Sequence, residues 1–176
     1  MPSNYYSTEG LIVKKMPFGE ADFLVRVLTR DFGKIDILAK GARKSASKLN
    51  SHLDILNRVR LNFVKPASTR SSLGGNGDRI PTLTDAEIIS RHDDWFSDSQ
   101  SLSVAGRVLQ VLDLIILHQS KDEELFLTAV DFFSKPDPSE ENAVKFLRLV
   151  FAHEGHGGEL PPEQFQNIIK LWPRLR

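Results

Sequence analysis

The chain contains no cysteine among its 176 residues. Without thiols it forms no disulfide, no thiolate-based zinc site and no cysteine nucleophile, and this composition fits a reducing compartment. Long apolar runs are lacking too. The longest, residues 108–117, is interrupted by Gln110 and Asp113 and is far shorter than a membrane span. No apolar segment typical of a secretory signal follows the first residues. We therefore expect a cytoplasmic protein without membrane contact.

Signatures of catalysis and of cofactor binding are also missing. The Gly-rich stretch 74–77 lacks the Lys-Ser/Thr pair of a phosphate-binding loop, and no helical pattern follows it. His153 and His156 flank Glu154, but Gly155 lies between them and the spacing does not place two imidazoles on one helical face. No local Ser/His/Asp set is present. We expect no enzymatic activity, no metal and no cofactor.

The net charge of zero hides an uneven distribution of charge. Residues 1–80 contain 14 Lys and Arg against 7 Asp and Glu, whereas residues 81–176 contain 9 against 16. Halves of opposite sign indicate two units with different partners. The first half suits a polyanion, and the acidic second half suits contact with proteins.

Five stretches of the first half have the pattern of β-strands. In the clearest, residues 54–65, Val59, Leu61 and Phe63 alternate with polar residues, so that one face is apolar and the other open. The others span residues 5–14, 23–30, 33–39 and 80–89. Five strands with a short helix or loop between the third and fourth follow the order of an OB-fold barrel, a fold that binds nucleic acid through its strands and loops.

From residue 97 the apolar spacing becomes helical. One helix start is marked by Asp137 as N-cap with Pro138 in the first turn, and a last short helix is expected over residues 161–172. The sequence therefore predicts an α+β protein of two domains. A five-stranded OB-fold β-barrel is expected over residues 1–90 and an all-α helical domain over residues 91–176.

Basic residues concentrate after the third strand, among small polar residues. They are Lys40, Arg43, Lys44 and Lys48. This pattern is typical of a loop that binds a polyanion backbone, and the alternative is a solvated loop whose cations only keep the protein soluble. A second candidate set lies on the strands themselves. It consists of Lys34, Arg58 and Arg60, and its alternative is cross-strand pairing with acids.

Aromatic side chains often complement such cations, because bases of a single strand stack on them. The candidates are Tyr5, Tyr6, Phe18 and Phe32, although each also suits the core or a turn. Glu20 and Asp22 are adjacent to a Pro/Gly turn. We interpret these two as structural acceptors of backbone N–H groups, not as a catalytic pair.

Four short runs stand out in the first 65 residues: Thr8-Glu-Gly-Leu-Ile-Val13, Pro17-Phe-Gly-Glu-Ala-Asp22, Leu28-Thr-Arg-Asp-Phe-Gly-Lys34 and Ala39-Lys-Gly-Ala-Arg-Lys44. In this order and spacing they resemble the N-terminal domain of the bacterial RecO family of recombination mediators. The resemblance implies an OB domain that binds single- and double-stranded DNA and promotes annealing in DNA repair. It also implies a nucleoid-associated protein with two partners, RecR and the acidic C-terminal tail of single-stranded-DNA-binding protein, and it implies RecA loading as the outcome.

The chain departs from that family in one respect. Many members run longer and carry a four-cysteine zinc module in the helical domain, and because this chain has no cysteine the zinc role is not carried over. Cations that could line a groove for the acidic tail are Arg107, Lys145 and Arg148. An alternative function is a non-catalytic OB-fold adapter that binds protein or RNA without annealing DNA.

Overall fold

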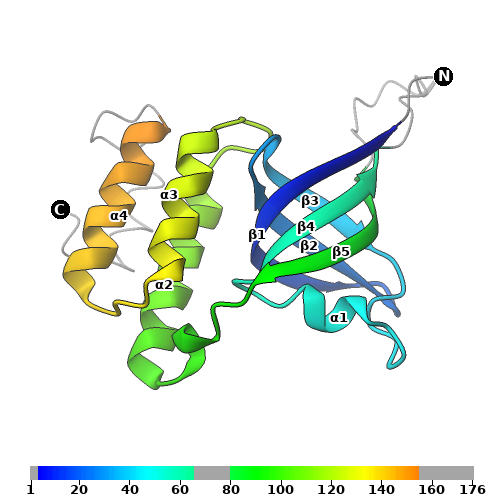
Figure 1. Ribbon diagram of the computed structural model, residues 1–176, viewed down its shortest axis with the longest axis horizontal. Helices are drawn as coiled ribbons and strands as arrows, with labels where there is room; N and C mark the ends of the chain where they lie inside the picture. The colour runs from blue at the N-terminus through cyan, green and yellow to red at the C-terminus, as the bar shows by residue number, and fades with distance from the viewer. Residues whose placement is uncertain (1–3, 66–79, 155–176) are drawn as a thin grey trace. The chain divides into compact units, whose positions relative to one another are not determined.

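The structure is a computed structural model that describes residues 4–65 and 80–154. The Gly-rich stretch 74–77 and the helix expected over residues 161–172 lie outside these ranges. The chain divides into two compact units, whose elements Figure 1 shows. We call Met1–Leu28 with Ile35–Ser90 the barrel unit, and Thr29–Lys34 with Arg91–Arg176 the helical unit.

A closed five-stranded barrel is formed in the order β1-β2-β3-β5-β4 (Figure 1). Strand β4 pairs antiparallel with both β1 and β5, and β3 meets β5 in parallel. The bounds are β1 Tyr5–Phe18, β2 Asp22–Thr29, β3 Gly33–Ala39, α1 Leu49–His52, β4 Arg58–Val64 and β5 Thr82–Ser90. The short helix α1 thus lies between the third and fourth strands, as the OB-fold order predicts.

The alternation of side chains along β4 places the core of the barrel. Val59, Leu61 and Phe63 are fully buried, and the polar residues between them face outward. Across the core, Gly10 lies against β2 so closely that a Cβ atom would stand 2.3 Å from Val27 Cγ1. The interior is therefore packed with apolar side chains, and nucleic acid has access only to the outer surface and the loops.

Strand β4 begins at Arg58, and the prediction of a strand from residue 54 is wrong. Leu56 has a φ of 69°, which lies outside the extended region. Asn57 is buried, and its side-chain amide donates hydrogen bonds to the carbonyls of Ser51 (3.2 Å) and His52 (3.1 Å). The side chain of Asn57 therefore closes α1, while the backbone of Leu56 and Asn57 bonds to Ile12 of β1 before β4 begins.

The elements of the helical unit after the hairpin are η1 Asp93–Phe96, α2 Ser99–Ile115, α3 Glu123–Ser134 and α4 Glu140–His153. Trp95 is fully buried, and its indole N–H donates to the Phe133 carbonyl at 2.8 Å. Phe132 stacks on Phe146 with ring centroids 4.2 Å apart. Across residues 4–65 and 80–154, no helix has the length and apolar character to cross a membrane. The predicted five-stranded barrel followed by helices is confirmed.

Helix α4 is capped by Ser139, and the prediction of Asp137 as N-cap is wrong. Ser139 Oγ accepts a hydrogen bond from the Asn142 N–H at 3.3 Å, whereas Asp137 Oδ1 accepts one from the Ser139 N–H at 3.0 Å. The bond from the backbone of Ser139 lowers the pKa of Asp137 below its ordinary value. Asp137 therefore fixes the turn before the helix instead of its first residues.

The tip of the β2–β3 hairpin belongs to the helical unit. The Gln119 N–H donates to the Lys34 carbonyl at 3.0 Å. Gly33 has a φ of 65°, and a Cβ atom there would stand 2.2 Å from the Ser120 carbonyl oxygen. The tip therefore lies directly against the segment that joins α2 to α3.

Candidate nucleic-acid interface

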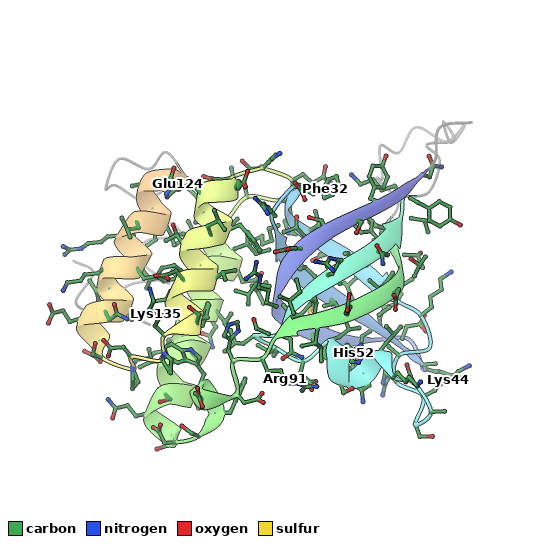
Figure 2. The ribbon with its side chains drawn as sticks, in the orientation of Figure 1. Phe32, Lys44, His52, Arg91, Glu124 and Lys135 are labelled. Atoms are coloured by element: carbon green, nitrogen blue, oxygen red, sulfur yellow. The ribbon has the colours of Figure 1, made fainter. Side chains whose placement is uncertain are left out.

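The basic loop is the segment of residues 40–48, between β3 and α1. Its four cationic side chains are all exposed to solvent. They are Lys40, Arg43, Lys44 and Lys48. Figure 2 shows Lys44 on this loop. The loop therefore presents its positive charge to solvent, as a backbone-binding site requires.

A second turn, between β1 and β2, holds the basic loop in place. The Gly41 N–H donates to Asp22 Oδ1 at 2.7 Å, and the Arg43 N–H donates to the Ala21 carbonyl at 2.9 Å. The Arg43 guanidinium also donates to the Gly19 carbonyl, at 2.9 Å. These three bonds tie the two turns together, so the cations extend from a fixed backbone.

Both turns depend on glycine. Gly19 has a φ of 58° and Gly41 a φ of 68°, a conformation that residues with a Cβ atom rarely adopt. Ala42, next to Gly41, is fully buried and fixes this part of the loop to the protein. Asp22 accepts a backbone N–H as predicted, although that N–H comes from the loop after β3. The sequence pattern missed this link because the two turns are far apart along the chain.

The basic loop brings together four cations that have no acidic partner within the described part of the chain. Among the residues that the structure describes, the side chains of Lys40, Arg43, Lys44 and Lys48 make no ion pair, and Arg43 bonds only to a carbonyl. Several cations elsewhere are held by acids. Examples are Lys15 with Asp54 at 3.0 Å, Arg26 with Asp36 at 2.7 Å and Arg58 with Glu9 at 2.6 Å. Arg91, Lys121 and Arg148, which are scattered along the chain, also make no ion pair among the described residues. Uncompensated positive charge therefore concentrates at the basic loop.

Arg58 and Arg60 are neutralised on the open face of the sheet. Arg60 is the direct cross-strand neighbour of Glu9 on β1 and of Glu87 on β5. Its guanidinium lies 3.9 Å from the first carboxylate and 3.4 Å from the second. The alternative reading of these arginines as cross-strand partners therefore describes what they do in the structure, and a phosphate has to displace an acid to reach them.

Lys34, which the sequence predicts as a DNA contact, is buried in the structure and bonded within the protein. The residue is only 3% exposed. Its ammonium donates to the Asp113 carbonyl at 2.6 Å and lies 3.9 Å from the carboxylate of the same residue. Strand alternation placed Lys34 on an open face, but the first residues of β3 belong to the hairpin tip within the helical unit.

The cations predicted to bind a protein tail lie on the helices. Arg107 is partly buried and pairs with Glu140 at 3.6 Å, and Lys145 pairs with Glu141 at 2.7 Å. The hydrogen bond to Glu141 raises the pKa of Lys145 and lowers that of Glu141. Arg148 is exposed. Within the described residues, no group of His, Asp or Glu is arranged to hold a metal ion.

The sequence was compared with protein families and with known proteins. The sequence model of the family "Recombination protein O N terminal" matches residues 1–91. The chain is 32% identical over 147 residues to the DNA repair protein RecO of Thermodesulfovibrio yellowstonii and 27% identical over 149 residues to that of Acetivibrio thermocellus. These matches cover 82% and 83% of this chain but 55% of each relative. The chain therefore spans about half the length of these relatives, and it belongs to the RecO family.

Proposed function

We propose that this chain acts in DNA repair and recombination by binding DNA through the basic loop. The observation that carries the proposal is the cluster of exposed cations without acidic partners at residues 40–48 of the described chain. Contacts with phosphates supply most of the affinity when a protein binds DNA without regard to base sequence. The names of the relatives, DNA repair protein RecO, support the biological process.

The same contacts support annealing. Phosphates are common to single- and double-stranded DNA, so we expect binding to both with little dependence on sequence. Two complementary strands repel each other through their phosphates, and cations held on a fixed loop reduce that repulsion and leave base pairing to complete the reaction. No covalent bond changes in this scheme. It therefore requires neither nucleotide hydrolysis nor a cofactor.

For the two halves of the chain we propose different tasks in the bacterial cytoplasm. Residues 1–90 form the DNA-binding domain, and residues 91–176, whose excess of acids repels DNA, form a protein-docking domain. The proposed partners are RecR and the acidic tail of single-stranded-DNA-binding protein, with assisted RecA loading as the outcome. The proposed tail contacts are Arg107, Lys145 and Arg148. If charge reversal at Lys145 and Arg148 leaves tail binding unchanged, this last assignment is wrong.

The DNA proposal is tested by fluorescence anisotropy with labelled single-stranded DNA. One variant reverses the loop cations: K40E, R43E, K44E and K48E. A matched control makes the same change of charge on the helical unit: K121E, K135E, K145E and R148E. We expect the loop variant to lose at least about a hundredfold in affinity because its phosphate contacts are gone, and the control to lose far less.

Two results contradict the proposal. Binding that survives in the loop variant moves the site elsewhere, and the Arg58/Arg60 face is then tested next. A wild-type protein that folds but binds no DNA favours the second candidate function, an OB-fold adapter for protein or RNA. Circular dichroism of each variant verifies that the fold is intact.

A further inference from the structure

Phe18 is an exposed aromatic residue beside the basic loop. It is the last residue of β1, and 46% of its surface is exposed. Exposed phenylalanines that occur singly are common in soluble proteins, so exposure alone identifies no site. A second observation is that Phe18 lies next to a residue that is hydrogen-bonded to the basic loop.

The backbone next to Phe18 is bonded directly to a DNA-binding candidate. The carbonyl of Gly19 accepts a hydrogen bond from the Arg43 guanidinium at 2.9 Å. The Arg43 N–H, in turn, donates to Ala21 at 2.9 Å. Phe18 therefore directly precedes the residue whose carbonyl binds the Arg43 guanidinium, and that guanidinium makes no ion pair among the described residues.

This arrangement combines the two parts of a single-strand binding site. Such sites pair cations that follow the phosphates with an aromatic surface on which a base stacks. The bases of a duplex are already stacked on one another, so an aromatic side chain reaches only the bases of a single strand. We propose that Phe18 is a base-stacking residue that gives the basic loop a preference for single-stranded over double-stranded DNA, a proposal that rests on the proposed function.

Substitution of Phe18 by an apolar residue of similar size distinguishes base stacking from a structural role of the side chain. Phe18→Leu keeps an apolar side chain at the end of β1 but removes the aromatic face, and Phe18→Ala removes both. Phe96 supplies a matched control, because it is 47% exposed and lies in the helical unit. Phe18→Trp restores an aromatic face and adds a fluorophore.

The experiment measures the affinity of each variant for three probes of equal length: a thymine single strand, an abasic single strand and a duplex. Phe18→Leu and Phe18→Ala should lose on the order of tenfold in affinity for the thymine strand and nothing for the abasic strand or the duplex. Phe96→Ala should match the wild type on all three. Phe18→Trp should retain single-strand affinity, and its added emission should be quenched by the thymine strand alone.

Other outcomes overturn the proposal in distinguishable ways. If the Phe18 variants bind the thymine strand as tightly as the wild type, while reversal of the loop cations abolishes binding, Phe18 does not contact a base and the proposed function stands. An equal loss on all three probes assigns Phe18 to support of the loop instead of stacking. A wild-type protein that binds none of the probes removes the proposed function and this inference together.

Discussion

At the scale of single residues, the partners of a cation determine its capacity to bind phosphate. Arg26 makes two parallel bonds to Asp36, from Nε at 2.7 Å and from Nη2 at 2.8 Å. Lys15 donates to the Asn50 carbonyl at 2.8 Å and to Asp54 at 3.0 Å. Charge-assisted bonds of this kind are the strong ones. The bonds of Arg26 and Lys15 therefore stabilise the fold, whereas the cations of the basic loop make no ion pair among the described residues.

Lys34 should contribute to stability and not to DNA binding. Lys34→Met removes the ammonium that bonds to the partly buried carbonyl of Asp113, which then loses this donor. We expect the free energy of unfolding to fall by about 1–3 kcal/mol, measured by urea denaturation, with DNA affinity unchanged in the protein that remains folded. Lys40→Met is the control and should show the reverse: unchanged stability and weaker binding. A loss of DNA affinity in Lys34→Met alone would restore Lys34 to the interface.

The sequence identified the exposed cations of the loop but not the buried one. Lys40, Arg43 and Lys44 follow a strand and lie among small residues, so their exposure follows from local composition. Lys34 fits the same alternation, yet its ammonium bonds to Asp113, which is distant in the sequence. A periodic pattern describes one element at a time and contains no information on which distant element packs against it.

At the scale of elements, two turns act as one support for the site. Asp22 is the acid whose carboxylate holds Gly41, whereas Glu20, in the same turn, is exposed and makes no hydrogen bond through its side chain among the described residues. The two residues carry the same charge at nearly the same place. Substitution of each residue in turn therefore distinguishes the effect of removing a negative charge from the effect of removing a hydrogen bond that holds the basic loop.

Removal of Asp22 should weaken DNA binding even though it removes a negative charge. Asp22→Ala frees the basic loop, and the cost of ordering it again on binding should lower affinity by about three- to tenfold. Glu20→Ala removes the same charge without loss of a bond and should raise affinity slightly. Anisotropy measures both, and hydrogen exchange at the Gly41 amide should be faster in Asp22→Ala only. Tighter binding by both variants would show that the loop needs no support.

Gly33 should be more sensitive to substitution by alanine than Gly19. Ala at this position meets the Ser120 carbonyl oxygen at 2.2 Å and also adopts a left-handed backbone. Gly19→Ala is the control, because its φ of 58° is similar but nothing lies within 4 Å of the added Cβ atom. We expect Gly19→Ala to lower the free energy of unfolding by about 1–2 kcal/mol, and Gly33→Ala by a further ~1–3 kcal/mol because of the clash. Equal effects in urea denaturation would contradict this packing.

Strand order was predictable and strand ends were not. Alternation of Val59, Leu61 and Phe63 identified β4, because one face of an antiparallel strand must be apolar. Its start was misplaced because Leu56 is an apolar residue just before the alternating run, whereas the side chain of Asn57 bonds to the carbonyls that end α1. Bonds from a side chain to the backbone five or six residues earlier leave no periodic signal.

At the scale of the whole molecule, opposite charges are divided between the two halves of the chain. The first 80 residues carry the excess of Lys and Arg, and the remainder carries the excess of Asp and Glu. Within the barrel unit, however, the arginines of the described strands are paired with acids. The net charge of a half therefore indicates the sign of its partner, and the pairing of individual side chains indicates where that partner binds.

The central claim is that the unpaired cations at residues 40–48 bind the DNA backbone, and the salt dependence of single-strand affinity tests it most directly. With four phosphates neutralised, a log–log plot of the wild-type association constant against salt should have a slope of about −3. Replacement of Lys40, Arg43, Lys44 and Lys48 by Gln should reduce the slope to near zero, whereas replacement of Arg58 and Arg60 by Gln should leave it unchanged. A slope that stays near the wild-type value in the first variant and collapses in the second would contradict the claim and place the interface on the open face of the sheet.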